Sequence, residues 1–113
     1  MKVGYSLWIK SDDGNKVFGQ GPYRLLILVD RLGSLNKAAS EMGMAYSKAL
    51  NILKNAEREL NVKLLEREIG GAKGGGSKLT QEARRLIEKY EGFRNDAAQE
   101  IERIYAKYFA EDV

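Results

Sequence analysis

The feature that most constrains this chain is its C-terminal segment, which has the pattern of one long helix. Thr80 is a suitable N-cap residue, and the apolar residues after it recur at alternating steps of four and three. These residues are Ala83, Ile87, Tyr90, Ala97, Ile101, Ile104 and Tyr108, with Arg94 interrupting the series and Phe93 beside it. A helix of about 30 residues is about 45 Å long. That is too long to pack wholly on the core of a 113-residue chain.

An apolar seam of this length favours pairing with a second helix. We therefore expect a homodimer that forms through residues 80–113. The alternative is a helix folded back in two pieces, with Gly92 as the break. The residues expected at the dimer interface are Ile87, Tyr90, Phe93, Ala97, Ile101, Ile104 and Tyr108.

The composition excludes several classes of function. Cysteine and histidine are absent, which excludes disulfides, the usual zinc ligands and catalysis by a nucleophile paired with histidine. Because no motif for carboxylate or lysine chemistry is present, we expect no enzyme, cofactor or metal. No apolar run reaches the roughly 18–20 residues of a membrane span, and the N-terminus has no signal-peptide core. We therefore expect a cytoplasmic protein without membrane contacts.

The first half of the chain predicts a β-hairpin followed by three helices. Residues 5–10 and 16–18 are rich in β-formers on either side of a turn cluster. Pro22 suits the first turn of a helix that ends at Gly33. Ser34 is a good N-cap for a short second helix, and a third helix is expected over residues 46–60 after the turn at Gly43.

A second hairpin is expected between the third helix and the long one. Residues 62–69 favour a strand, residues 70–76 a glycine-rich tip, and residues 77–79 a returning strand. The glycine spacing resembles a phosphate-binding loop, but Gly76 stands where the lysine belongs and a strand follows instead of a helix. A nucleotide-binding loop is therefore rejected. The order of elements predicts a mainly helical winged helix-turn-helix over residues 1–79, with an N-terminal β-hairpin and a C-terminal dimerisation helix over residues 80–113.

The charge distribution and the third helix favour double-stranded DNA as the partner. Residues 43–78 carry seven basic and four acidic residues, whereas residues 79–113 carry six basic and eight acidic ones. With its apolar side inward, the third helix would offer side chains suited to base edges and phosphates. A merely solvated face remains the alternative. The expected DNA contacts are Ser34, Asn36, Lys37, Tyr46, Ser47, Lys48, Asn51, Lys54 and Asn55, with Lys73 and Lys78 on the wing.

Three segments resemble the DNA-binding domain of LysR-type regulators: residues 33–39, residues 56–67 and the pair Leu79–Thr80. The glycine-rich wing, the leading hairpin with Trp8 and residues 44–49 resemble more closely the N-terminal domain of the ModE-like, molybdate-responsive regulators. The resemblance covers about residues 5–93 and implies a homodimer on a roughly palindromic operator.

The chain departs from this family pattern in two respects. Ala45 stands where the family usually has a Ser or Thr cap for the third helix. Alanine at an N-cap lowers stability by about 1 kcal/mol relative to serine. The sequence ends at Val113 without a molybdate-binding domain, so oxyanion sensing is not expected and no small-molecule effector is identifiable. The main hypothesis is a sequence-specific transcription regulator. The alternatives are a sequence-tolerant architectural DNA-binding protein and a protein-interaction module that acts through the last helix.

Overall fold

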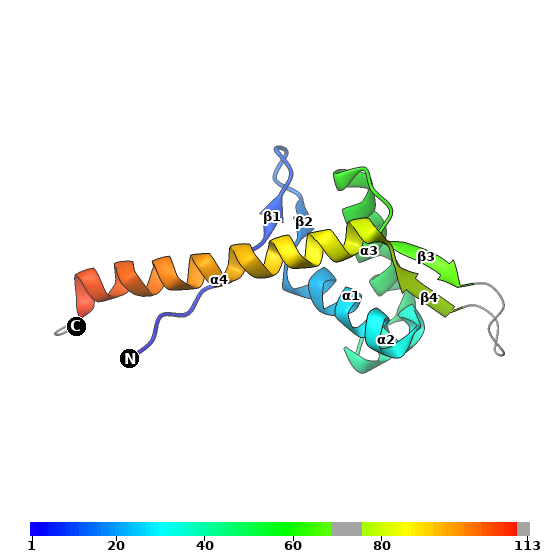
Figure 1. The fold of residues 1–113 in the computed structure, drawn as a ribbon, viewed down its shortest axis with the longest axis horizontal. Coiled ribbons are helices and arrows are strands. Elements are labelled where there is room, and N and C mark those ends of the chain that lie inside the picture. Colours follow the sequence, from blue (N-terminus) through cyan, green and yellow to red (C-terminus); the bar gives the residue numbers. More distant parts are fainter. Residues whose placement is uncertain (69–75, 111–113) are drawn as a thin grey trace.

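A winged domain with one long projecting helix forms residues 1–68 and 76–110, which the computed structural model describes (Figure 1). The elements are β1 (Ile9–Lys10), β2 (Lys16–Phe18), α1 (Gln20–Leu32), α2 (Leu35–Glu41), α3 (Tyr46–Leu60), β3 (Leu65–Glu68), β4 (Gly76–Leu79) and α4 (Gln81–Phe109). Strands β1 and β2 form one antiparallel hairpin and β3 and β4 another. The predicted fold class is confirmed: helices dominate, and the strands form two small hairpins.

The core lies where α1, α2 and α3 meet, and β2 and the first turns of α4 close it. Helix α1 contributes its fully buried leucines and Val29, and β2 contributes Phe18, which is 1% exposed. Helices α2 and α3 face this core with Ala38, Ala39, Ala49 and Ala56, all buried. Alanine side chains are small, so the helix axes can lie close together and the short α2 is held firmly between its neighbours.

The turn between α2 and α3 sets the direction of α3. The Ser34 hydroxyl oxygen accepts the backbone N–H of Lys37 at 3.1 Å, which confirms the predicted N-cap of α2. Gly43 has a φ of 69°, in the left-handed region where a side chain would be strained. The Met44 N–H then donates to the Ala39 carbonyl at 3.0 Å, which closes the turn just before α3 begins.

The hairpin β3–β4 forms the wing and is tied to the helices at its base. The Ser77 N–H donates to the carbonyl of Gly33 between α1 and α2 at 3.0 Å. The Thr80 hydroxyl donates to the Lys63 carbonyl at 2.7 Å and accepts the Ala83 N–H, so the predicted cap of α4 is confirmed and also fastens the wing. The predicted glycine-rich tip falls largely on residues 69–75, outside the described residues.

Helix α4 is continuous through Gly92, so the predicted alternative of two pieces is not what the structure contains. Its first turns pack on the core and the rest extends away from the body (Figure 1). The Cα radius of gyration is 17.0 Å and the extents are 60 × 29 × 24 Å, whereas a compact chain of this length would have a radius of about 13 Å. Within the described part of the chain, no helix combines the length and apolar character needed to cross a membrane.

Candidate nucleic-acid interface

The outer side of α3 carries a row of exposed polar side chains. Ser47, Asn51, Lys54 and Arg58 follow one another at intervals of four, three and four residues, which places them on one side of the helix. The opposite side consists of the buried residues Ala49, Leu53 and Ala56. Arg58 was not among the predicted contacts, although its spacing from Lys54 already placed it on this side. The structure thus brings two amide or hydroxyl side chains and two cations together on one face.

Two further predicted residues lie at the edges of this row. Tyr46 is 48% exposed on the side of α3 that faces the wing, and Lys48 is exposed on the side that faces the hairpin β1–β2. Both belong to the first turn of α3, which begins without a side-chain cap because the Ala45 side chain has no oxygen. The N-terminal end of α3 is therefore bordered by two hydrogen-bonding side chains that point to different flanks.

Asn55 differs from the exposed polar row of α3, because its side chain is already engaged within the chain. Its side-chain amide donates to the backbone carbonyl of Lys16 at 2.8 Å, and its side-chain oxygen accepts from the Arg58 guanidinium at 2.6 Å. Asn55 is half-buried. Its role in this structure is to join α3 to the hairpin β1–β2.

The polar row of α3 lies between two hollows. On the hairpin side, a groove of about 880 Å³ runs between β1–β2, the start of α1 and α3. On the wing side, a hollow of about 520 Å³ is lined by Ser34, Asn36, Tyr46, Arg67 and Ser77, among others. Helix α3 is thus accessible from both flanks as well as along its outer side.

The start of α2 borders the same surface. Asn36 and Lys37 are exposed, whereas Ser34 is half-buried and uses its hydroxyl oxygen to cap α2. Ser34 and Asn36 line the wing-side hollow together with Tyr46. The structure therefore places these predicted residues beside the first turn of α3, although they come from a different helix.

The wing contributes charges that largely offset one another at its base. Lys78 lies opposite Glu66 in the β3–β4 register, and its ammonium is 3.9 Å from the Glu66 carboxylate. Both side chains are more than half exposed, so the pair contributes little to stability and opens readily. Arg67 is exposed and lines the wing-side hollow, but the predicted contacts did not include it. Lys73, the other predicted wing contact, lies outside the described residues.

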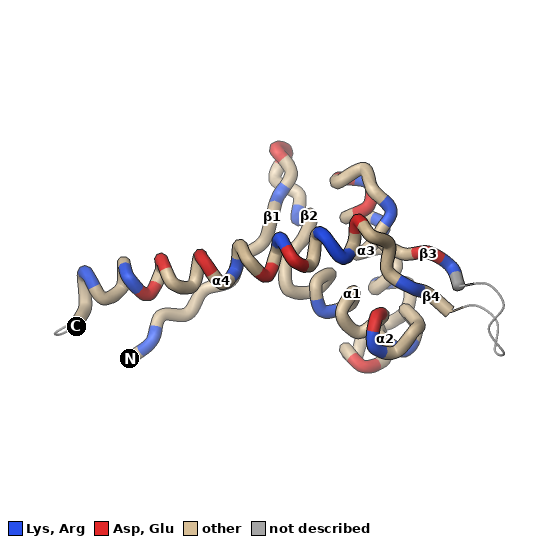
Figure 2. The backbone as a smooth tube through the Cα atoms, in the orientation of Figure 1, with Lys and Arg blue, Asp and Glu red and all other residues tan. Residues whose placement is uncertain are grey.

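Helix α4 divides into an anchored half and a projecting half, which corrects part of the predicted dimer seam. Ile87 is 8% exposed and Tyr90 is 2% exposed, because both pack into the core of their own chain. They therefore offer no surface to a partner. Farther along, Phe93, Ile104 and Tyr108 are exposed and Ala97 and Ile101 are half-buried. Acidic and basic residues are interspersed along this half of the helix (Figure 2).

A polar and aromatic cluster fixes the point where α4 leaves the body. The Tyr23 hydroxyl donates to the Glu91 carboxylate at 2.5 Å, and this acceptor, helped by burial, raises the pKa of Tyr23 above its usual value. The Arg94 guanidinium lies over the rings of Tyr23 and Tyr90, at 4.9 and 5.6 Å from their centres. It also donates to the Gln20 side chain at 2.7 Å. These contacts join α4 to the start of α1.

The described residues contain no group of three acidic side chains that could hold a metal ion. The surface around α3 instead offers amides, hydroxyls and cations. Such side chains form hydrogen bonds with base edges and ion pairs with phosphates.

Comparison with protein families and curated proteins agrees with this arrangement. Residues 22–84 match the family described as bacterial regulatory helix-turn-helix protein, lysR family. The chain is 38% identical over 68 residues to the transcriptional regulator ModE of Haemophilus influenzae and 30% identical over 81 residues to the molybdenum transport protein ModE of Azotobacter vinelandii. These matches cover 60% and 72% of this chain but only 27% and 30% of the two relatives.

Solved structures share the fold. The CbnR_DBD–DNA complex superposes with a TM-score of 0.57 at 21% identity, over 77% of this chain and 94% of that one. The complex of BenM_DBD with catB site 1 DNA gives a TM-score of 0.55 at 24% identity, over 80% of this chain and 93% of that one. Both resemblances inferred from the sequence are therefore confirmed, and the family match spans more than half of the chain. The chain belongs to the lysR family of bacterial regulatory helix-turn-helix proteins.

Proposed function

We propose that the chain binds double-stranded DNA with sequence preference, as a homodimer that places α3 of each protomer in the major groove. The observation that carries this proposal is the polar row of α3, which is exposed along its outer side and open on both flanks. The CbnR and BenM structures are complexes in which domains of the same fold are bound to DNA, which supports the same partner here.

The side chains of α3 divide by chemistry into base contacts and phosphate contacts. Asn51 can form a bidentate pair with adenine, and Lys54 can approach guanine or a phosphate. Ser47 and Tyr46 carry hydroxyls suited to phosphate oxygens. Asn36 lines the wing-side hollow and Lys37 is the next residue of α2, so both can contact the same DNA phosphates. Lys73 and Lys78 of the wing would contact the flanking phosphates or the minor groove.

The dimer is proposed to form along the projecting half of α4. Ile101, Ile104 and Tyr108 continue the side of the helix that begins in the core with Ala83 and Ile87. Once α4 leaves the body, the described part of the chain places no core beneath this side, and Tyr108 is 68% exposed. A second α4 would bury it. The proposed seam consists of Phe93, Ala97, Ile101, Ile104 and Tyr108.

Selection of binding sites from random duplex DNA tests this function. A dimer with one recognition helix per protomer should enrich two inverted half-sites about one helical turn, or about 34 Å, apart. Binding without any enriched motif would favour the sequence-tolerant architectural protein instead. Absence of DNA binding would favour the protein-interaction module that acts through α4.

A further inference from the structure

A groove beside α3 has no role in the function described so far. It runs between the hairpin β1–β2 and α3 and has a volume of about 880 Å³. One wall comes from the hairpin, with Trp8, Lys16 and Phe18, and the other from α3, with Ser47, Lys48 and Asn51. Because Ser47 and Asn51 also belong to the polar row, the groove opens onto the surface proposed to face DNA.

The hairpin is a fixed wall and not a loosely attached extension. The Lys16 carbonyl accepts the Asn55 amide at 2.8 Å, which ties β2 directly to α3. Phe18 is buried and meets Tyr90 edge to face, with ring centres 5.3 Å apart. A side chain at Gly19 would approach the Trp8 Cβ to 2.8 Å, so only glycine lets Trp8 lie this close to the start of α1. The distance between hairpin and α3 is therefore set by contacts on several sides.

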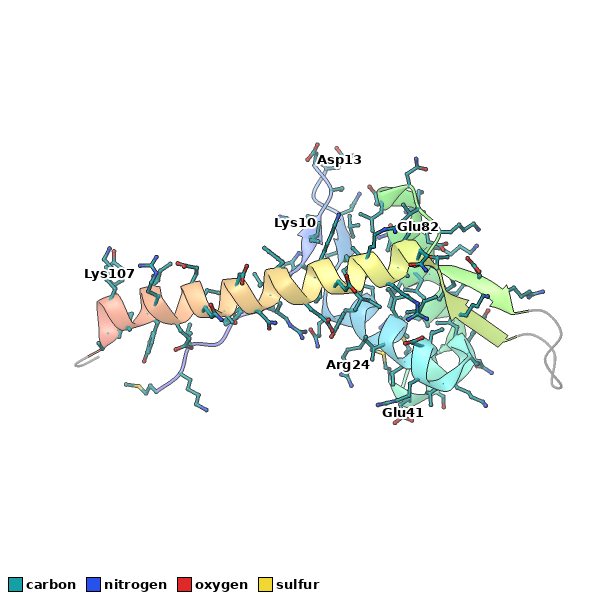
Figure 3. All side chains as sticks on the ribbon, in the orientation of Figure 1. Lys10, Asp13, Arg24, Glu41, Glu82 and Lys107 are labelled. Carbon is teal, nitrogen blue, oxygen red and sulfur yellow. The ribbon has the colours of Figure 1, made fainter. Side chains whose placement is uncertain are left out.

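The walls combine an exposed aromatic ring with positive charge. Trp8 is 43% exposed, and the Lys16 ammonium lies 4.6 Å from the centre of its ring. Lys48 provides a second cation from α3. None of the described residues that line the groove is acidic. The hairpin's two carboxylates, Asp12 and Asp13, lie in the turn between β1 and β2, and Figure 3 shows Asp13 at the far end of the hairpin.

We propose that this groove holds the sugar–phosphate backbone of the DNA strand on the hairpin side of α3, so that the hairpin β1–β2 acts as a second wing. The proposal rests on the proposed DNA-binding function. An α-helix with its side chains is about 10–12 Å wide and fills a major groove that is about 12 Å wide. Elements on the two flanks of α3 must then meet the two opposite backbones. The wing β3–β4 lies on one flank and the hairpin on the other.

The chemistry of the groove matches that ligand. The deoxyribose ring has an apolar face that can pack on the exposed indole of Trp8, and the adjoining phosphate can approach the ammonium groups of Lys16 and Lys48. Lys10 lies in β1 of the same hairpin and is also exposed, but it does not line the groove. Lys10 therefore provides a matched control for Lys16.

The first test uses the fluorescence of Trp8, the only tryptophan in the chain. Binding is followed independently by the anisotropy of a fluorescein-labelled duplex, and quenching of Trp8 by acrylamide is measured with unlabelled duplex at saturation. Covering the half-exposed ring should lower the quenching constant about twofold. The same quenching constant in the free and the bound protein would overturn the proposal. If Trp8 became protected from acrylamide as the protein concentration rises in the absence of DNA, the proposal would be overturned. The occupant of the groove would then be a second copy of the chain.

The second test compares Lys16→Ala with Lys10→Ala in the salt dependence of binding. Losing one phosphate contact should reduce the slope of log K against log salt by about 0.9. We expect this change for Lys16→Ala and the wild-type slope for Lys10→Ala. If the wild-type protein binds DNA and the two variants have equal slopes, the role of the hairpin as a second wing is overturned, whereas the proposed DNA-binding function is not. Absence of DNA binding by the wild-type protein would instead overturn the proposed function.

Discussion

Removing Arg94 should loosen the geometry between the winged domain and α4 while leaving the proposed dimer intact. Arg94 is the last residue of α4 that forms a hydrogen bond or ion pair to another element within the described residues. Its hydrogen bond to Gln20 and its two contacts with aromatic rings together contribute about 2 kcal/mol. Beyond it, residues 95–109 extend α4 by about 22 Å.

The length of this projecting segment determines the consequence for DNA binding. A change of about 10° in the direction of α4 moves its far end by about 4 Å, which is close to the rise of one base pair at about 3.4 Å. In a dimer formed through α4, the junction therefore sets the distance between the two recognition helices. Adding or removing one base pair between the half-sites should weaken DNA binding less for Arg94→Ala than for the wild type. We expect the loss of affinity to be smaller by up to about tenfold, which corresponds to about 1.4 kcal/mol.

The assay measures affinity for a series of duplexes that differ only in the spacer between half-sites. Arg103→Ala is the matched control, because Arg103 pairs only with Glu100 of the same helix, at 2.8 Å, among the described residues. Sedimentation should give the same oligomeric state for both variants. A spacer profile of Arg94→Ala that coincides with those of the wild type and Arg103→Ala would refute the argument that this junction sets the spacing.

Three further predictions concern the dimer and the stability of the fold. Ile104→Glu should convert the proposed dimer to a monomer in sedimentation, because it places a charge in the proposed seam. Arg103→Glu, on the other side of α4, should leave the oligomeric state unchanged. Ala45→Ser should raise stability by about 1 kcal/mol and the Tm by about 4 °C. The extended backbone at this N-cap (φ −66°, ψ 147°) suits a capping hydroxyl, and an unchanged Tm would mean that no cap forms. Because Glu91 raises the pKa of Tyr23, their hydrogen bond should stabilise the fold fully below about pH 10 and progressively less as pH rises through the raised pKa. Tyr23→Phe should lack this alkaline loss in pH-dependent urea unfolding, and the same loss in both proteins would assign it to another group.

Local sequence patterns were sufficient to predict most of the individual elements. Helix α3 has the predicted bounds because its apolar spacing continues from the first turn to Leu60, and Asn61 ends it with a φ of 54°. The caps at Ser34 and Thr80 were also predictable, because a capping hydroxyl acts on a backbone N–H only three residues away. Interactions of this kind depend on neighbours in the sequence alone.

The errors arose where contacts between distant residues decide the outcome. Heptad spacing correctly placed Ile87 and Tyr90 on the same side of α4 as Ile104. It could not indicate that the body covers this side at one end of the helix and leaves it exposed at the other. Asn55 has the spacing of an outward residue, and that spacing could not indicate its hydrogen bond to the Lys16 carbonyl, 39 residues earlier. The groove beside α3 was missed for the same reason, because nothing in the local pattern places the hairpin next to that helix.

The most direct test of DNA binding through α3 is the effect of Asn51→Ala on sequence discrimination. Binding to the selected operator and to random duplex is measured at the same salt concentration, with Asn95→Ala on the outer side of α4 as the control. Loss of a bidentate contact to adenine should weaken operator binding by about 1–3 kcal/mol and leave binding to random duplex nearly unchanged. Equal losses on both duplexes, or none on either, would contradict base contact by this face of α3.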